Sequence, residues 1–196
     1  MERLQRRLAR LDQGVRVRIC RQQLRRMKGL AGEIKATEAE LELLIRTEAP
    51  ALLELPGCGT LTAAKLLAEV AGVQRFSSDA KLAMLAGVAP LDASSGRQQR
   101  HRLNRKGNRQ LNLALHRIAA TQARVHPPAR AYLERKRAEG KSRREALRCL
   151  KRHLARVVFK LLRATAERCH KVNKLSSSNE TKIIEMPGLI SKPALT

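Results

Sequence analysis

The chain has 196 residues, of which 43% are apolar and only 2% aromatic, and its 41 Lys and Arg against 17 Asp and Glu give a formal net charge of +24. Such a charge indicates a polyanionic partner and argues against a purely structural protein whose charge serves solubility. No run of about twenty apolar residues could span a membrane. Scarce aromatic rings disfavour single-strand binding by base stacking, so contacts to the phosphates of duplex DNA remain.

The composition predicts the fold class and the environment. Ala, Leu, Arg, Glu, Lys and Gln dominate and β-branched runs are rare, so we expect an all-α protein with one compact domain and an extended element. Met1 to Asp12 is charged and lacks the apolar core of a signal peptide, which favours the cytoplasm. The cysteines form no CxxC pair and are expected to be free thiols, with no metal ligand among them: Cys20, Cys58, Cys149 and Cys169.

Residues 1–49 form a predicted helical linker. Apolar residues recur at alternating steps of three and four from Leu4 to Val15 and again from Met27 to Ile45. This heptad-like spacing predicts long helices over residues 3–48, with kinks or breaks at the glycines of positions 14, 29 and 32. Two arrangements fit the pattern equally well: an intermolecular coiled coil, or an amphipathic hairpin packed on its own domain.

Residues 55–59, Leu-Pro-Gly-Cys-Gly, form a glycine turn between two expected helices, the second starting at Thr60 or Thr62 as its cap. Small residues let a backbone approach a phosphate, and the N–H groups that open a helix can bind phosphate oxygens. Residues 50–72 therefore resemble a helix-hairpin-helix. Its expected DNA contacts are Gly57, Gly59, Thr60, Thr62 and Lys65. A glycine turn between two core helices is the alternative.

A short helix from Ser77 or Ser78 to Ala86 precedes a basic segment, residues 88–108, that has no sustained periodicity. We expect a loop here whose DNA contacts are Arg97, Arg100, Arg102, Arg105, Lys106, Asn108 and Arg109. Guanidinium groups can hold a phosphate beside Ser95 and stabilise transition-state charge. On spacing alone Ser95 remains a loop serine, because a hydroxyl needs activation to attack phosphorus. We expect this loop and the glycine turn to form one phosphate-binding surface.

Three more helices complete the predicted domain, residues 50–170. One runs from Arg109 to the prolines after His126, one lies between those prolines and Gly140, and the last extends to about residue 168. Ser142 and Glu145 form a capping box for the last helix. Ser, Asn, Pro and Gly break the periodicity afterwards, so residues 171–196 are expected to be a disordered tail.

In order and spacing, residues 50–123 resemble the C-terminal transposase domain of the Piv-type DEDD transposases, the insertion sequence one-hundred-and-ten family of bacterial mobile elements. The resemblance rests on the glycine turn, Phe-Ser-Ser at 76–78, the run from Leu85 to Pro90, the pair Ser95-Gly96, and Lys-Gly-Asn-Arg at 106–109. The heptads before it are similar to the helical linker that joins the two halves of such enzymes.

The resemblance implies a transposase that acts in DNA transposition and recombination and whose active site has two parts. In the family, an N-terminal RuvC-like domain holds magnesium with four acidic residues, and the C-terminal domain supplies a serine that forms a covalent phosphoserine with DNA. Ser95, directly before the glycine, matches that serine. The resemblance also implies that a structured guide RNA is a partner and that residues 3–48 associate with a second copy or a full-length transposase. We expect the protein to be associated with the bacterial nucleoid.

The sequence departs from the family in its acidic residues. We expect no RuvC-like sheet ahead of the linker, and the scattered carboxylates do not reproduce the acidic set: Glu54, Glu69, Asp79 and Asp92. We therefore assign no metal ligand and expect a truncated transposase that is inactive alone. The alternative function is a non-catalytic basic helix-hairpin-helix protein that binds nucleic acid, or a decayed transposase remnant.

Overall fold

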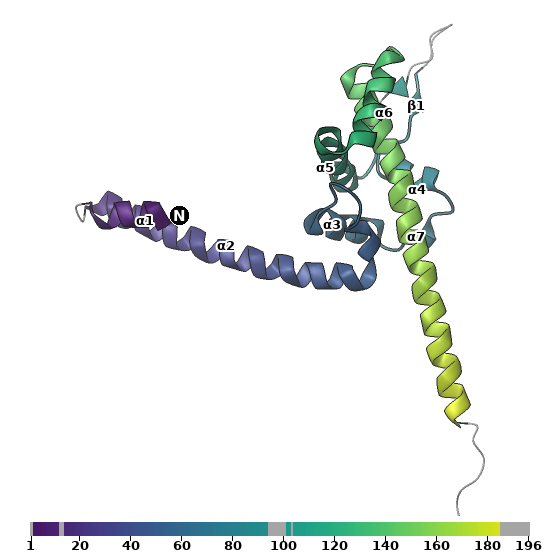
Figure 1. The fold of residues 1–196 in the computed structure, drawn as a ribbon, viewed down its shortest axis with the longest axis horizontal. Coiled ribbons are helices and arrows are strands. Elements are labelled where there is room, and N and C mark those ends of the chain that lie inside the picture. Colours follow the sequence, from purple (N-terminus) through teal and green to yellow (C-terminus); the bar gives the residue numbers. More distant parts are fainter. Residues whose placement is uncertain (1, 12–13, 94–100, 103, 185–196) are drawn as a thin grey trace, which may run out of the picture.

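The computed structural model describes residues 2–11, 14–93, 101–102 and 104–184. Helices dominate this part of the chain, so the all-α prediction is confirmed. Figure 1 shows them in order: α1 (Glu2–Ala9), α2 (Val15–Glu48), α3 (Thr60–Val70), α4 (Asp79–Leu85), α5 (Arg109–Val125), α6 (Pro127–Ala138) and α7 (Arg143–Ile184). Two 3-10 turns flank α3, namely η1 (Pro50–Leu52) and η2 (Val73–Arg75).

The hydrophobic core lies where α3, α4, α5 and α7 meet, and the end of α2 and η1 join it. On α5, Leu111, Leu115 and Ile118 recur at three- and four-residue steps and are fully buried, which is why this stretch forms an amphipathic helix. α7 contributes Leu154 and Val158 to the same core. Each such side chain stabilises the fold by about 1.5–3 kcal/mol.

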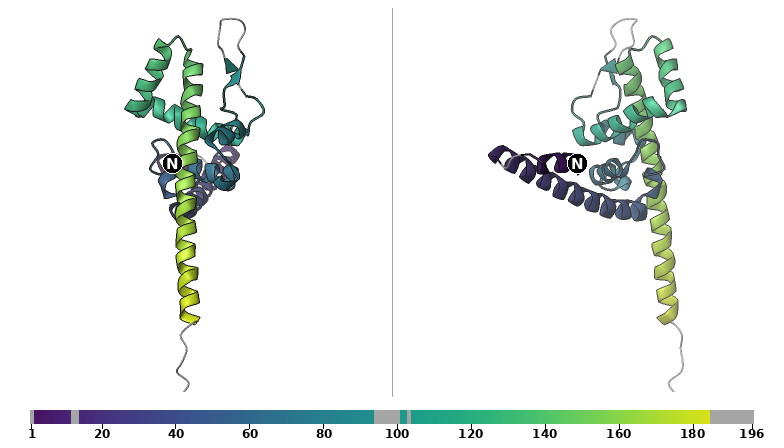
Figure 2. Two further views of the ribbon diagram at one scale, coloured as in Figure 1. Left: turned by 90° about the vertical axis from the view of Figure 1, so that its right-hand side faces the viewer. Right: turned by 60° about the vertical axis from the view of Figure 1, so that its left-hand side comes forward.

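Helix α2 leaves this core as a long arm, and α1 folds back along its first turns (Figures 1 and 2). Arg21 Nη2 donates a hydrogen bond to the carbonyl oxygen of Leu8 at 2.7 Å. Gly14 lies at the break between the two helices, as predicted. Gly29 and Gly32 lie inside α2 and do not interrupt it, because a glycine within an exposed helix costs only about 1 kcal/mol.

The middle of α2 keeps its apolar side chains on the surface. Met27, Leu30 and Ile34 are all exposed, whereas Ile45 near the end of the helix is buried in the core. Helix α2 thus joins the core only near its end, where it packs on α3 and η1, and its middle part extends away from the core. A coiled coil formed with a second chain stays a prediction for residues 3–48.

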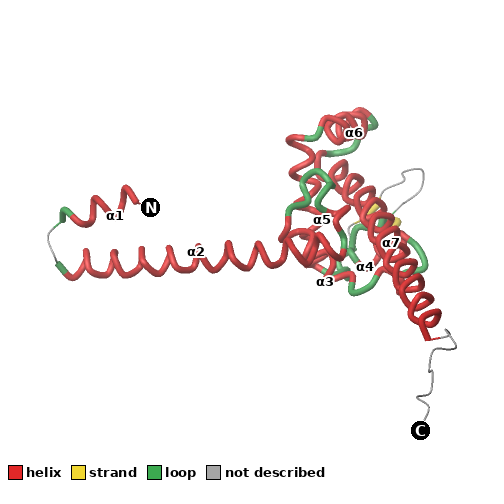
Figure 3. Tube along the Cα trace, turned by 60° about the horizontal axis from the view of Figure 1, so that its bottom comes forward, coloured by secondary structure: helices red, strands yellow, loops and turns green. Residues whose placement is uncertain are grey.

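The basic segment after α4 contains a short antiparallel ribbon in place of the loop expected from the sequence. Strands β1 (Leu91–Asp92) and β2 (His101–Arg102) pair with Leu91 opposite Arg102 and Asp92 opposite His101, and Figure 3 shows them in yellow. Strands of two residues are too short to produce an alternating pattern, so the sequence carries no sign of them.

Helix α7 is longer than the apolar pattern predicts. Its backbone stays helical to Ile184, so residues 171–184, expected to lack regular structure, continue the helix, and its lower part extends past the core in Figure 1. Extending an existing helix costs little, and the next helix-breaking residue is Pro187. Residues 185–196 lie outside the described residues. Within the described residues, no helix combines the length and the apolar character that a membrane crossing requires.

Candidate nucleic-acid interface

The glycine turn, residues 55–59, lies between η1 and α3 and packs against α5. Gly57 has a φ of +82°, and a Cβ placed there would lie 3.0 Å from Thr121 Cβ and 3.2 Å from the carbonyl oxygen of Ile118. Gln122 Nε2 donates a hydrogen bond to the carbonyl oxygen of Pro56 at 2.7 Å. Contact with α5 therefore accounts for the glycine at position 57 without any phosphate.

The start of α3, in contrast, is open to solvent. Gly59 is exposed, and a Cβ added to it would meet nothing within 4 Å. Gly59 itself is the N-cap, and its carbonyl oxygen accepts from the N–H groups of Thr62 and Ala63 at 2.9 Å each. Capping by Thr60 or Thr62 is thus wrong, because both lie inside the helix. The N–H groups of the first turn of α3 can still bind an anion, and the half-buried Lys65, one turn farther along, adds a positive charge.

The basic segment of residues 88–108, which carries Ser95 and is called the serine loop from here on, is closed at its base by a crossing of two glycines. Gly87, with a φ of +65°, follows α4, and Gly107 lies shortly before α5. A Cβ built on Gly107 would lie 2.2 Å from both the Cα and the N of Gly87. Next to this crossing, the Asn108 N–H donates to the carbonyl oxygen of Leu85 at 2.6 Å. Only glycine fits at such a contact.

Hydrogen bonds from asparagine side chains stabilise the same crossing. Asn112 Nδ2 donates to the carbonyl oxygen of Ala86 at 2.8 Å. Asn104 is buried, with its Nδ2 donating to the carbonyl oxygen of Met84 at 3.4 Å and its Oδ1 accepting from the Lys106 N–H at 3.0 Å. The two ends of the loop are thus held together by backbone contact and side-chain amides.

Asn108, predicted to contact DNA, has a local structural role. Its Oδ1 accepts from the N–H groups of Gln110 and Leu111 at 2.9 and 3.0 Å, which caps α5. Its Nδ2 donates to Glu69 Oε2 at 2.6 Å, near the end of α3. Asn108 therefore links α3 to the base of the serine loop.

The remaining predicted contacts divide into two groups. Arg102, Arg105, Lys106 and Arg109 are all exposed around the base of the loop. The others lie outside the described residues, so their positions stay a prediction: Ser95, Arg97 and Arg100.

The glycine turn and the serine loop lie at opposite ends of α5. Gly57 meets the helix at Thr121, whereas Gly107 lies just before its first residue. At 1.5 Å per residue, these two places are about 20 Å apart along α5. The expected single phosphate-binding surface is thus replaced by two separated contact points. The sequence pattern of each motif is local and does not show which part of α5 it would contact.

A basic groove of about 1380 Å³, which the sequence reasoning missed, runs between the base of the serine loop and α7. Residues 87–90, 101, 102 and 104 form one side, and the α6–α7 turn and the first turns of α7 form the other. Its basic side chains are Arg102, Lys136, Arg137, Lys141, Arg143, Arg148, Lys151, Arg152 and Arg156. The four-residue spacing of Arg148, Arg152 and Arg156 could have indicated this basic face of α7.

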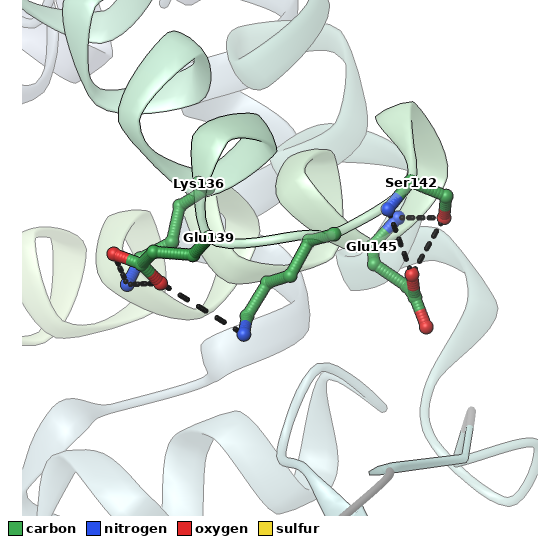
Figure 4. Close-up of polar contacts among 5 residues, drawn as sticks. Lys136, Glu139, Ser142 and Glu145 are labelled. Carbon is green, nitrogen blue, oxygen red and sulfur yellow. Dashed lines mark hydrogen bonds and ion pairs between the residues drawn. The ribbon is translucent and has the colours of Figure 1, made fainter.

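Carboxylates at the mouth of the groove have partners. Lys136 Nζ lies 2.8 Å from Glu139 Oε2, and Glu145 Oε2 accepts from the N–H and Oγ of Ser142 at 2.9 and 2.7 Å (Figure 4). The Glu145 N–H donates in turn to Ser142 Oγ at 3.4 Å, which confirms the predicted capping box.

Farther along the groove, two arginines of α7 share one carboxylate of α4. Asp79 Oδ2 accepts from Arg152 Nη1 at 2.9 Å and from Arg156 Nε at 3.2 Å. The hydrogen bond from Arg152 is the main reason that the pKa of Asp79 lies below its usual value, with a smaller contribution from Arg156. These two arginines therefore help to hold α7 on α4.

Residues 49–134 match the family model described as the transposase IS116/IS110/IS902 family. The chain is 38% identical over 132 residues to the 43.6 kDa protein of insertion element IS110 from Streptomyces coelicolor. It is 35% identical over 135 residues to the 42 kDa protein of insertion element IS900 from Mycobacterium paratuberculosis, and 32% identical over 134 residues to the 44.8 kDa protein of insertion element IS116 from Streptomyces clavuligerus.

These alignments cover 66%, 67% and 66% of this chain but 33%, 34% and 33% of the relatives. The chain thus spans about a third of the length of the curated relatives it matches. The matches support a relation to insertion-sequence transposases, and the matched segment contains both the glycine turn and the serine loop.

Proposed function

We propose that this chain is the DNA-binding C-terminal part of an insertion-sequence transposase and acts in DNA transposition and recombination. The observation that carries the proposal is the glycine crossing of Gly87 and Gly107 within the matched family segment. It gives the loop of Ser95 a fixed base, and the exposed Arg102, Arg105 and Lys106 surround that base. A fixed base among cations suits a loop that must present a hydroxyl to a phosphate.

In this proposal Ser95 is the nucleophile. Its Oγ loses its proton to solvent and attacks the phosphorus of a phosphodiester, so that a Ser–O–P bond forms. The bond from phosphorus to one ester oxygen of the DNA strand breaks, and that oxygen takes up a proton and leaves as the hydroxyl end of the cut strand. Nearby guanidinium groups stabilise the extra negative charge of the transition state. The free energy of the broken ester is kept in the phosphoserine, so the strand can be rejoined.

Magnesium, which the resemblance implies, does not fit the described residues. Among them, no group of three His, Cys, Asp or Glu side chains is placed to hold a metal ion. The carboxylate of Glu69 binds Asn108, and that of Asp79 binds arginines of α7. We therefore assign magnesium to a separate RuvC-like half.

Further partners belong to the same proposal. Duplex DNA would contact the base of the serine loop and the open start of α3 at Gly59. A second copy or a full-length transposase would pair with residues 3–48, where Met27 and Ile34 are exposed. A structured guide RNA is a further partner, and the bacterial nucleoid is the expected location.

The proposal is tested by mixing the protein with DNA and a RuvC-like half and measuring protein–DNA adducts. Ser95→Ala should abolish adducts and leave duplex binding intact, while Ser94→Ala, the neighbouring control, should keep both. Adducts from Ser95→Ala would exclude Ser95 as nucleophile. If the unaltered protein binds duplex and forms no adduct, the non-catalytic alternative holds instead.

Salt dependence tests DNA binding without chemistry. If about six phosphates are neutralised, log affinity should fall against log salt with a slope of about −5. A flat response would contradict binding through the phosphate backbone.

A further inference from the structure

Lys151 is a buried cation on the floor of the basic groove. Lys151 is only 7% exposed, and its Nζ donates a hydrogen bond to Oδ1 of Asn112, whose side chain is a neutral amide. Desolvation lowers the pKa of Lys151, and the neighbouring charge of Arg148 lowers it further. A buried ammonium is costly unless an anion pairs with it, and within the described residues none lies at ion-pair distance from Lys151.

The groove around Lys151 has an excess of positive charge. It is lined by nine Lys and Arg side chains and three Glu. Glu139 lies 2.8 Å from Lys136 and 3.8 Å from Lys141, and Glu145 caps α7 while lying 3.7 Å from Arg148. Two of the three carboxylates, those of Glu139 and Glu145, are thus already shared among cations, and the excess of positive charge leaves the groove as a whole suited to an external anion.

The shape of the groove favours a duplex. Residues 143–156 place basic side chains along about 20 Å of α7, and the same length of B-form DNA carries roughly a dozen phosphate charges on its two strands. Tyr132 is the Tyr ring that lines the groove, and it already stacks on His153 at a centroid distance of 6.1 Å. Among the described residues, the groove therefore offers no free Phe, Tyr or Trp ring on which single-stranded bases could stack.

We propose that this groove binds the phosphate backbone of duplex DNA, with a phosphate over Lys151 and Arg148. The inference rests on the proposed function, because the other side of the groove is the base of the serine loop, residues 87–90 and 101–102. Duplex DNA in the groove would lie next to the base of the loop that carries Ser95. The groove thus holds the duplex that flanks the cleavage site.

Native cysteines provide the test. Cys149 lines the groove and is half-buried, whereas Cys20 lies exposed on α2, and both are free thiols. The unaltered protein is treated with iodoacetamide, with and without saturating duplex oligonucleotide, and alkylation is measured for each peptide by mass spectrometry. Duplex should slow alkylation of Cys149 several-fold and leave Cys20 unchanged. Equal rates at Cys149 with and without duplex would overturn the inference.

Charge variants test the same surface by affinity. Arg137→Gln with Arg143→Gln, two exposed groove residues, should lower duplex affinity roughly tenfold and reduce the salt slope by about 2. The matched control, Arg25→Gln with Lys28→Gln, removes the same charge from exposed positions on α2. It should leave both the duplex affinity and the salt slope nearly unchanged.

The outcomes separate the two proposals. If the unaltered protein binds no duplex, the proposed function fails and the groove assignment with it. If it binds duplex but Cys149 is not protected, or the groove variant keeps full affinity, only the groove assignment fails. Protection of Cys149 by structured RNA alone would replace duplex DNA with RNA in the groove.

Discussion

Gly107 and Gly87 approach so closely that a Cβ on Gly107 would lie 2.2 Å from the Gly87 Cα, well inside van der Waals contact. The contact joins the segment after α4 to the segment before α5, so it fixes both ends of the serine loop at once. A residue other than glycine at position 107 would have to push these two backbones apart, and neither backbone can move as a flexible side chain would.

Gly107→Ala should therefore separate the two ends of the serine loop. We expect a loss of about 2–4 kcal/mol in the free energy of unfolding, from overpacking and from the hydrogen bonds beside the crossing. Urea denaturation measures it. Gly29→Ala is the matched control, because it lies in exposed helix with open space around it and should stabilise the protein by about 0.5–1 kcal/mol. Equal stability of Gly107→Ala and the unaltered protein would show that the backbones do not cross.

The hydrogen bond between Asn108 and Glu69 can be tested by exchanging the amide and the carboxylate between the two positions. Asn108→Asp keeps the oxygen that caps α5 but places a carboxylate against Glu69, and it should cost about 1–2 kcal/mol. Adding Glu69→Gln restores a donor to the pair and should recover about 1 kcal/mol of that loss. A double-mutant cycle of unfolding free energies gives the coupling, and strictly additive effects would mean that the two side chains do not interact.

The features that the sequence predicted well are those decided within a few residues. Ser142 and Glu145 cap α7, and Ser78 accepts from the Lys81 N–H at the start of α4, because each bond joins neighbours in the chain. The burial of one face of α5 follows from its spacing in the same way, since Ile118 and its neighbours share one side of the helix.

The features that the sequence did not predict depend on contacts between distant residues. Gly57 looked like a phosphate contact because no local pattern shows that Thr121 would fill the space beside it. The groove joins residues of the serine loop to residues of α7, and Lys151 becomes buried only when α7 packs on Asn112. Such arrangements follow from which helix packs on which, and the periodicity of a single helix does not determine that.

Stability should depend on pH through Asp79. Its pKa is lowered in the folded state, so its contribution to stability is present above the pKa of an unfolded Asp, about 3.9, and is lost as the pH falls through the lower native value. Asp79→Asn should cost about 1–2 kcal/mol at neutral pH, through the two arginine contacts and the first turn of α4.

The difference between Asp79→Asn and the unaltered protein should shrink as the pH is lowered below about 4, as measured by urea denaturation at several pH values. Glu167→Gln serves as the control, because its ion pair with Arg163 is exposed and should contribute less than about 0.5 kcal/mol at any pH. A constant difference for Asp79→Asn down to strongly acidic pH would mean that the Asp79 carboxylate does not stabilise the fold.

The thiol of Cys58 reports whether the glycine turn is packed on α5. Cys58 is 4% exposed, and burial raises its pKa to about 11, so almost no reactive thiolate is present at neutral pH. We expect iodoacetamide to modify the exposed Cys20 readily and Cys58 at least about a hundred times more slowly, through transient opening. Gly57→Ala should raise the reactivity of Cys58, since its Cβ would press on Thr121, whereas Gly59→Ala has open space and should not. Cys58 reacting as fast as Cys20 in the unaltered protein would show that the turn is detached from α5 and free to contact a phosphate at Gly57.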